Sequence, residues 1–332
     1  MNILKTVKKL PGGLMVVPLL LGAIINTFFG KSILGMTETG VWDWFGGTFT
    51  ENLFKTGAMP ILAVFLFCNA TTIDFKKAGV PLYKGVVLTA TKVLTGIVIG
   101  IVIGRVFGPN GILGLAPLAI VGAISNSNGG LYAALAGEYG DATDVGAVSI
   151  LSINDGPFFT MVALGAAGVA TIPITVLIGC LIPIIIGCIL GNLDEEIRKF
   201  CEPGATMMIP FFAFPLGAGL HLSNLLKAGI PGIILGVVCT LVTGLGGYFV
   251  YKLLKMKYPE VGAGIGTTAG NAAATPAAVA TADPSLAAVA GIATVQITAA
   301  IIVTAILCPL LTSYLHKAEE KKRAGVTSSK TG

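Results

Sequence analysis

The sequence AISNSNGGLYAAL, residues 123–135, interrupts an apolar run with six consecutive residues that are polar or lack a side chain. Residues 125–130 read Ser-Asn-Ser-Asn-Gly-Gly. Glycine permits unusual backbone dihedral angles, and Ser and Asn supply hydrogen-bond donors and acceptors, so we expect the helix to open here. An unsatisfied backbone group in hydrocarbon costs several kcal/mol. An opened membrane helix must therefore be buried in protein or face a water-filled cavity.

Composition places the whole chain in a membrane. Its 332 residues are 54% hydrophobic and only 11% charged, whereas soluble domains carry about 25% charged residues. Mean hydropathy is +0.88. Apolar windows of about 20 residues recur along the chain, which predicts an all-α polytopic membrane protein. We interpret the net charge of +5 as reflecting which loops lie on the cytoplasmic side of the membrane, and we expect no nucleic-acid partner.

Reading the apolar windows predicts about ten transmembrane spans. They cover residues 14–30, 53–70, 80–106, 112–140, 144–168, 170–191, 204–221, 230–254, 260–283 and 285–314. With ten spans, most of the 21 lysine and arginine residues fall on the amino-terminal side of the membrane. The positive-inside rule then predicts that both termini are cytoplasmic.

Five pairs of matching segments indicate an internal repeat. For example, KKAGVP at 76–81 matches LKAGIP at 226–231, and SNGG at 127–130 falls opposite GNAA at 270–273. We therefore predict a first five-helix repeat over residues 1–168 and a second over residues 169–315. A disordered cytoplasmic tail, 316–332, is expected to follow.

An odd number of spans per repeat inverts the second copy in the membrane. Inverted repeats are a frequent architecture of secondary transporters, with alternating access by movement of one part against the other. The chain contains no phosphate-binding P-loop, so transport is expected to be driven by a gradient.

Interrupted segments at corresponding places in two halves point to a binding site. Here they lie in spans four and nine, at residues 125–130 and 267–276, the second reading TTAGNAAATP. Amino-terminal ends of the restarting half-helices suit an anion, and freed carbonyls suit a cation. The alternative is small-residue helix packing with Ser and Asn hydrogen bonds. Predicted substrate-binding residues are Ser125, Asn126, Ser127, Asn128, Gly129, Gly130, Asn271 and Thr275.

Two ionisable residues lie within spans. Asp155 is near the centre of span five, between apolar flanks. Burial favours a neutral carboxyl group, so Asp155 is the expected proton-coupling residue, with Asn154 beside it and Gln296 at the corresponding place in the second half. Lys92 lies midway along span three and needs Asp155 or a substrate carboxylate as a partner. The alternatives are a structural carboxyl group at Asp155 and a lysine reaching the membrane surface.

The six cysteines and two histidines carry no expected chemistry. No CxxC pair occurs, and the cysteines lie in or beside apolar runs, as small buried residues do. We therefore expect no cofactor, no resident metal site and no enzyme activity, because intramembrane enzymes usually show Ser/His, paired-Asp or His-rich constellations.

The chain resembles the 2-keto-3-deoxygluconate permease family of bacteria over nearly its whole length. The resemblance rests on MNILKTVKKLPGG at 1–13, AISNSNGGLYAALAGEYGD at 123–141, SINDGPFF at 152–159 and GNAAATPAAVA at 270–280. It implies a multi-pass protein of the bacterial inner membrane that imports 2-keto-3-deoxygluconate by proton symport.

That family is grouped with bile-acid sodium symporter-like transporters, which have ten spans and crossed, broken fourth and ninth helices. The grouping implies a sodium site at Ser125, Asn126, Ser127, Asn128 and Asn154. Two coupling hypotheses therefore stay open: proton symport of a small sugar-acid anion, and sodium symport of a related organic anion. A passive channel is a further alternative. The oligomeric state is left open.

Overall fold

The computed structural model describes the backbone of residues 2–9, 13–30, 32, 39–74, 79–108 and 111–330. Within these ranges, the side chains of Met15, Ser152, Asp155, 223–228 and 324–330 lie outside the description. The described backbone is helical and contains no β-strand beyond one isolated bridge between Ile112 and Leu115. The all-α class predicted from composition is confirmed.

The described residues of the first half of the chain form twelve helical segments. They are α1 (Ile3–Lys9), α2 (Gly13–Phe29), α3 (Val41–Trp44), α4 (Phe49–Phe54), α5 (Ala58–Thr71), α6 (Val80–Phe107), α7 (Pro117–Ile124), α8 (Gly129–Tyr139), α9 (Ala142–Gly146), α10 (Val148–Leu151), the 3₁₀ turn η3 (Ser152–Asp155) and α11 (Pro157–Ala166).

The described part of the second half contains both long helices and short helical segments. They are α12 (Ile174–Leu193), α13 (Glu195–Cys201), α14 (Gly204–Gly217), α15 (Leu222–Cys239), the π-helical turn η4 (Thr240–Gly244), α16 (Leu245–Leu253), the 3₁₀ segments η5 (Pro259–Ile265) and η6 (Gly270–Ala274), α17 (Thr275–Ala282), the 3₁₀ turn η7 (Pro284–Leu286) and α18 (Ala287–Lys330).

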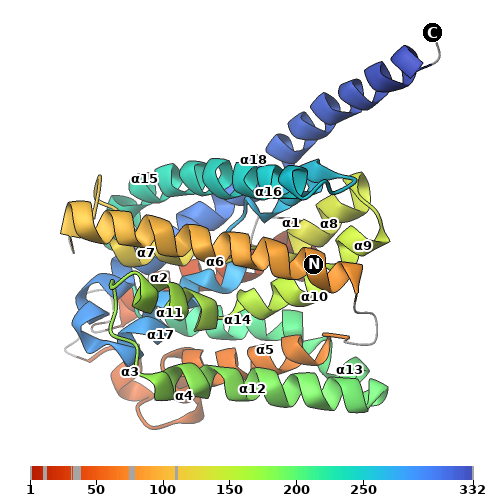
Figure 1. The fold of residues 1–332 in the computed structure, drawn as a ribbon. Helices are drawn as coiled ribbons and strands as arrows, with labels where there is room; N and C mark the ends of the chain where they lie inside the picture. The colour runs from red at the N-terminus through yellow and green to blue at the C-terminus, as the bar shows by residue number, and fades with distance from the viewer. Residues whose placement is uncertain are drawn as a thin grey trace.

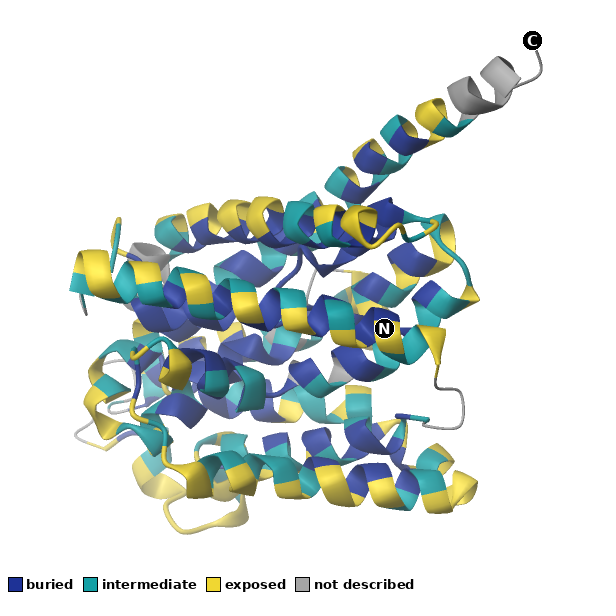
Figure 2. Ribbon diagram, viewed as in Figure 1, coloured by how far each residue is buried: buried dark blue, intermediate teal, exposed yellow. Residues whose placement is uncertain are grey.

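Four helical stretches in the described part are long and apolar enough to cross a membrane: Val80–Phe107, Ile174–Leu193, Gly229–Leu253 and Pro284–Arg323. Helix α12 has 20 residues, which corresponds to about 30 Å and matches a hydrocarbon core. Exposed large apolar side chains recur along it every three or four residues, at Ile174, Ile178, Ile182, Ile185 and Ile189. Figure 2 shows such exposed residues, in yellow, along both α12 and α15. This apolar outer surface fits a lipid environment.

The broken segments lie inside the bundle. Helix α6 crosses the front of the view in Figure 1, with α12 and α5 along one side and α15 and α16 along the opposite side. Helix α7 packs against α6, α18 and α17, and α17 in turn packs against α18 and α11. All ten predicted spans contain helical segments. The inverted relation between residues 1–168 and 169–315 stays a prediction.

Close helix packing depends on glycine at several contacts. Gly187 and Gly191 of α12 face the backbone of α5, and Gly232 and Gly236 of α15 face α18. A β-carbon at these positions would meet backbone atoms of the neighbouring helix. Small residues at helix contacts are typical of membrane proteins, where close backbone approach supplies much of the packing energy.

The carboxy-terminal segment begins as a helix attached to the bundle, and the predicted disorder of the tail, residues 316–332, stays a prediction. Helix α18 continues through this segment to Lys330, and its blue end projects from the bundle in Figure 1. Residues 316–323 are tied to the bundle by ion pairs. Arg323 Nη2 lies 2.7 Å from Glu260 Oε2, and Lys252 Nζ lies 3.0 Å from Glu319 Oε1. Sequence reasoning missed these pairs because their partners lie some 60 residues or more away.

Candidate functional site

The fourth predicted span is interrupted at the expected place. Helix α7 ends at Ile124 and α8 begins at Gly129. Asn128 caps α8 by accepting a hydrogen bond from the Leu131 backbone N–H at 2.9 Å, which satisfies one of the free donors at a helix start. Ser125, Asn126 and Ser127 are buried between the two half-helices. We call residues 125–128 the first break.

The ninth predicted span is also interrupted. The 3₁₀ segment η5 ends at Ile265, and α17 does not begin until Thr275. Between them lie irregular backbone and the short segment η6. Thr267 and Thr268 are buried, as are Asn271 and Thr275. We call residues 266–274 the second break.

The two breaks are hydrogen-bonded to each other. The Asn128 backbone N–H donates to Thr267 Oγ1 at 2.9 Å, and the Ala269 backbone N–H donates to Asn126 Oδ1 at 3.0 Å. Thr268 Oγ1 donates to the Ala123 carbonyl at 3.1 Å. Backbone groups freed by one break are thus satisfied by side chains of the other. This arrangement explains how irregular backbone persists inside an apolar bundle.

The side chain of Asn126 connects the two breaks by hydrogen bonds. Besides accepting from Ala269, its Nδ2 donates to the Gly122 carbonyl at 2.7 Å, and the residue is 1% exposed. Both ends of its amide are therefore occupied by backbone groups. Asn126 therefore joins α7 to the second break, and its predicted role as a substrate ligand stays a prediction.

A third interruption was missed by sequence reasoning. Span five changes from α10 to the 3₁₀ turn η3, and Gly156 separates η3 from α11. Within η3, Asn154 Nδ2 donates to the Ser125 carbonyl at 2.8 Å, and Ser125 Oγ lies 2.7 Å from Thr160 Oγ1 of α11. The Asp-Gly-Pro sequence at 155–157 is the local signal that could have predicted this turn. The first break is thereby bound to span five as well as to the second break.

Several buried polar atoms at the breaks have no hydrogen-bond partner among the described residues. They are Ser127 Oγ, Asn154 Oδ1 and Asn271 Nδ2. Leaving such a buried group unpaired costs about 1–3 kcal/mol. Two hydroxyl or carbonyl oxygens and one amide donor are therefore available to a ligand, an ion or water.

Lys92 reaches the second break from α6. Its side chain is fully buried, and Nζ donates to the Thr267 carbonyl at 2.8 Å and to Thr243 Oγ1 at 3.1 Å. The Cys239 sulfur lies 3.8 Å away. Among the side chains that the structure describes, no carboxylate lies within ion-pair distance of Lys92. The side chain of Asp155, its expected partner, lies outside those residues, so that pairing stays a prediction.

The remaining predicted residues fall in different environments. Gln296 holds the loop before α7: its Nε2 donates to the Gly114 carbonyl at 2.7 Å, and its Oε1 accepts from the Ala116 N–H at 3.2 Å. Both of its polar atoms are thus engaged away from the breaks, unlike those of its predicted counterpart Asn154. In the first turn of α8, Gly129 is buried and Gly130 is exposed.

Charged residues gather near the ends of the broken helices. Lys84 Nζ lies 2.6 Å from Asp144 Oδ1, and both side chains are almost completely buried. Asp141, beside them, caps α9. The Thr143 hydroxyl donates to its carboxylate at 2.6 Å and lowers the pKa of Asp141 to about 2.

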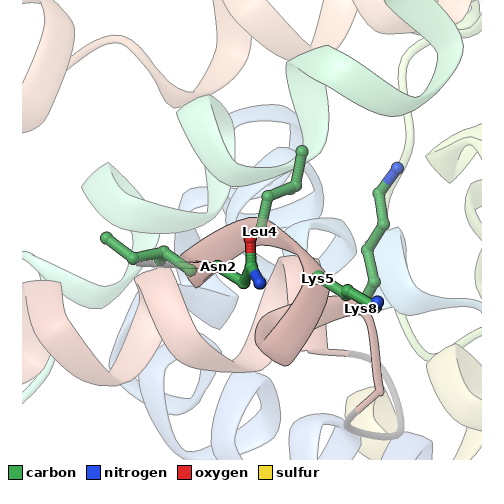
Figure 3. A pocket seen from close by; sticks show the side chains of 5 residues that line it. Asn2, Leu4, Lys5 and Lys8 are labelled. Atoms are coloured by element: carbon green, nitrogen blue, oxygen red, sulfur yellow. The ribbon is translucent and has the colours of Figure 1, made fainter.

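Figure 3 shows a hollow on the amino-terminal helix α1, with Asn2, Leu4, Lys5 and Lys8 around it. It is lined by residues 2–5 and Lys8 and by none of the break residues. In the described part of the chain, no group of three or more His, Cys, Asp and Glu side chains could hold a metal ion. The interlinked breaks, with Lys92 beside them, are the candidate functional site.

Comparisons with known proteins identify the family of this chain. The sequence model of the 2-keto-3-deoxygluconate permease family matches residues 4–321. The chain is 50% identical over 324 residues to 2-keto-3-deoxygluconate permease 1 of Salmonella typhimurium, covering 97% of this chain and 98% of the relative. It is 38% identical over 328 residues to the 2-keto-3-deoxygluconate permease of Bacillus subtilis, covering 97% and 96%. It is 36% identical over 331 residues to that of Escherichia coli, covering 98% of each. The chain therefore belongs to the 2-keto-3-deoxygluconate permease family, a family of transporters and not of enzymes.

Proposed function

We propose that this protein imports 2-keto-3-deoxygluconate across the bacterial inner membrane by proton symport with alternating access, both termini being cytoplasmic. Family membership and the names of three relatives support the substrate. The observation that carries the mechanism is the contact between two interrupted helices inside the bundle, with the buried Lys92 beside it. Broken helices near the midplane are how secondary transporters present backbone and side-chain groups to a substrate.

The chemistry of the site suits a hydroxylated keto acid. The substrate carboxylate would bind near the Lys92 ammonium, the only cationic group among the described residues that donates to a break. The hydroxyl and keto groups would bind the unpaired atoms Ser127 Oγ and Asn271 Nδ2, with Thr275 and the backbone at Gly129 closing the site. Filling these unpaired positions would satisfy buried groups that otherwise cost free energy.

Proton uptake is assigned to Asp155, at the third interruption. Its neighbour Asn154 contacts the Ser125 carbonyl of the first break, so a change of charge at Asp155 would act next to the substrate site. Binding an anion and a proton in neighbouring places links the two events, because each stabilises the other.

Uptake of labelled sugar acids into proteoliposomes tests the proposal. We expect an inwardly directed proton gradient to drive accumulation of 2-keto-3-deoxygluconate without sodium. Asp155→Asn should retain exchange of internal for external substrate but lose accumulation against a gradient. Accumulation that needs sodium and ignores the proton gradient would refute proton coupling, and undiminished accumulation by Asp155→Asn would refute its assignment.

One observation favours sodium coupling as a second candidate. Ser127 Oγ and Asn154 Oδ1 are buried acceptors that have no hydrogen-bond partner among the described side chains, and oxygen atoms of this kind are suitable ligands for a hard cation. Measuring uptake while the sodium concentration is varied at constant pH separates sodium coupling from proton coupling. A sodium-dependent KM that disappears in Asn154→Leu would support this alternative, and uptake indifferent to sodium would exclude it.

A further inference from the structure

Lys92 is a buried lysine whose described partners are all uncharged. The Nζ atom contacts a carbonyl, a hydroxyl and a thiol, from Thr267, Thr243 and Cys239, and the side chain has no exposed surface. Neutral partners return only part of the free energy that an ammonium loses on leaving water. A site with this arrangement gains most from a ligand that brings a negative charge.

Thr243 is held in place independently of Lys92. Its hydroxyl donates to the Cys239 carbonyl at 2.7 Å, one turn earlier, at the end of α15. Because that bond uses the hydroxyl proton, the oxygen lone pairs are left to accept from Lys92 at 3.1 Å. Thr243 thus orients the Lys92 ammonium group through one hydrogen bond, whether or not Lys92 keeps its bond to the Thr267 carbonyl.

The helix that carries Thr243 has a π-helical turn at this point. Residues Thr240–Gly244 form five-residue π geometry between the regular helices α15 and α16, and π turns are rare and frequently occur at functional sites. Gly244 ends the turn against η5 and the start of the second break, where an added β-carbon would lie 3.3 Å from the Ala263 carbonyl and 3.4 Å from Gly266 Cα. The turn places the Thr243 hydroxyl beside Lys92, at 3.1 Å, and 3.3 Å from the Ile265 carbonyl that precedes the second break.

Thr267 differs from Thr243 because its backbone is irregular. Its carbonyl lies in the stretch between η5 and η6, which has no helical hydrogen-bond ladder to hold it. The Lys92–Thr267 bond of 2.8 Å joins α6 to this stretch. A carboxylate offered to the same ammonium forms a charge-assisted bond that is about twice as strong as one to a neutral carbonyl.

We propose that Thr243 is a positioning residue that aims the Lys92 ammonium at the substrate carboxylate, and that this carboxylate replaces the Thr267 carbonyl. The exchange recognises the acid group and at the same time releases the second break from α6. Carboxylate binding thereby starts the rearrangement of the site. The inference rests on the proposed function, since it assumes that a sugar acid is the substrate.

The test is the kinetics of proteoliposome uptake by Thr243→Val, Thr243→Ser and a matched control. The control is Thr95→Val, which removes a hydroxyl of α6 whose one hydrogen-bond partner in the described part of the chain is the Thr91 carbonyl of its own helix. We expect Thr243→Val to raise the KM for 2-keto-3-deoxygluconate about tenfold, the loss of roughly one hydrogen bond to a charged group. Thr243→Ser and Thr95→Val should stay within about twofold of the wild type.

Competition by the uncharged amide of the substrate distinguishes a Thr243 that orients Lys92 toward the carboxylate from a Thr243 that only stabilises the fold. The wild type should be inhibited far better by the acid than by its amide, and Thr243→Val should lose most of that preference. A merely structural role would weaken acid and amide equally. Thr243→Val with an unchanged KM and an unchanged acid-to-amide ratio would overturn the proposal.

Folding is checked by size-exclusion chromatography and thermal unfolding in detergent. Thr243→Ala replaces the valine variant if the latter does not fold. If neither folds while Thr243→Ser does, the hydroxyl is structural and the proposal is wrong. Failure of the wild type to take up any sugar acid would instead refute the proposed function, and the two failures are thus distinct.

Discussion

Replacing Asn126 by leucine should separate the two breaks. The leucine side chain has a similar size but cannot bond to the Ala269 N–H or to the Gly122 carbonyl, which Asn126 meets at 3.0 and 2.7 Å. The Ala269 N–H would be left buried without a partner, at a cost of about 1–3 kcal/mol, and the lost bond to Gly122 adds about 1 kcal/mol. We expect the free energy of unfolding to fall by about 2–4 kcal/mol.

Reversible unfolding in mixed detergent micelles, at increasing SDS, measures this loss. Thr298→Val is the control, because the buried Thr298 hydroxyl donates to the Thr294 carbonyl of its own helix and to no other described group. The stability of this variant should change by less than about 1 kcal/mol. Substrate uptake should fall more steeply for Asn126→Leu than for the control. A loss below about 0.5 kcal/mol for Asn126→Leu would mean that Asn126 does not hold the breaks together.

Three further substitutions test the surroundings of the site. Lys84→Met should destabilise the protein by about 3–5 kcal/mol because it leaves the buried Asp144 carboxylate without its ion-pair partner. The double variant Lys84→Met with Asp144→Leu should recover most of this stability in thermal unfolding. A double variant that is no more stable than Lys84→Met would contradict the pairing. Gly187→Val should abolish the close contact of α12 with α5 and lower the melting temperature, whereas the open position Gly179 should accept alanine without loss. Asp141→Ala should cost about 1 kcal/mol as a lost helix cap. Because the pKa of Asp141 is lowered to about 2 in the folded protein, this contribution is present at neutral pH and disappears as pH falls from about 4 toward 2; a pH-independent difference between variant and wild type would contradict it.

Much of the site could be predicted from local sequence. The polar run at residues 125–130 and the Gly/Pro-containing run at residues 267–276 predicted two interruptions, and both are present. These features are readable because helix breaking depends on residues close together in the chain. Burial of Lys92 also followed from its place in an apolar run.

The roles of individual polar atoms could not be predicted in the same way. Asn126 and Asn128 look alike in sequence, yet Asn126 bonds across to Ala269 while Asn128 caps its own helix. Gln296 and Asn154 occupy corresponding places in the proposed repeat, but one holds a loop and the other holds a break. These differences depend on which backbone group lies opposite each side chain after the helices have packed.

The sequence by itself determined the membrane class, the helical secondary structure, the family and the positions of the two breaks, because hydropathy and helix interruption are local properties. Only the tertiary structure decided what surrounds Lys92. Its partners Thr243 and Thr267 lie 151 and 175 residues away in the chain, and no local pattern specifies such a contact. They meet because irregular backbone inside an apolar bundle must find hydrogen-bond partners, and the nearest ones are supplied by other helices.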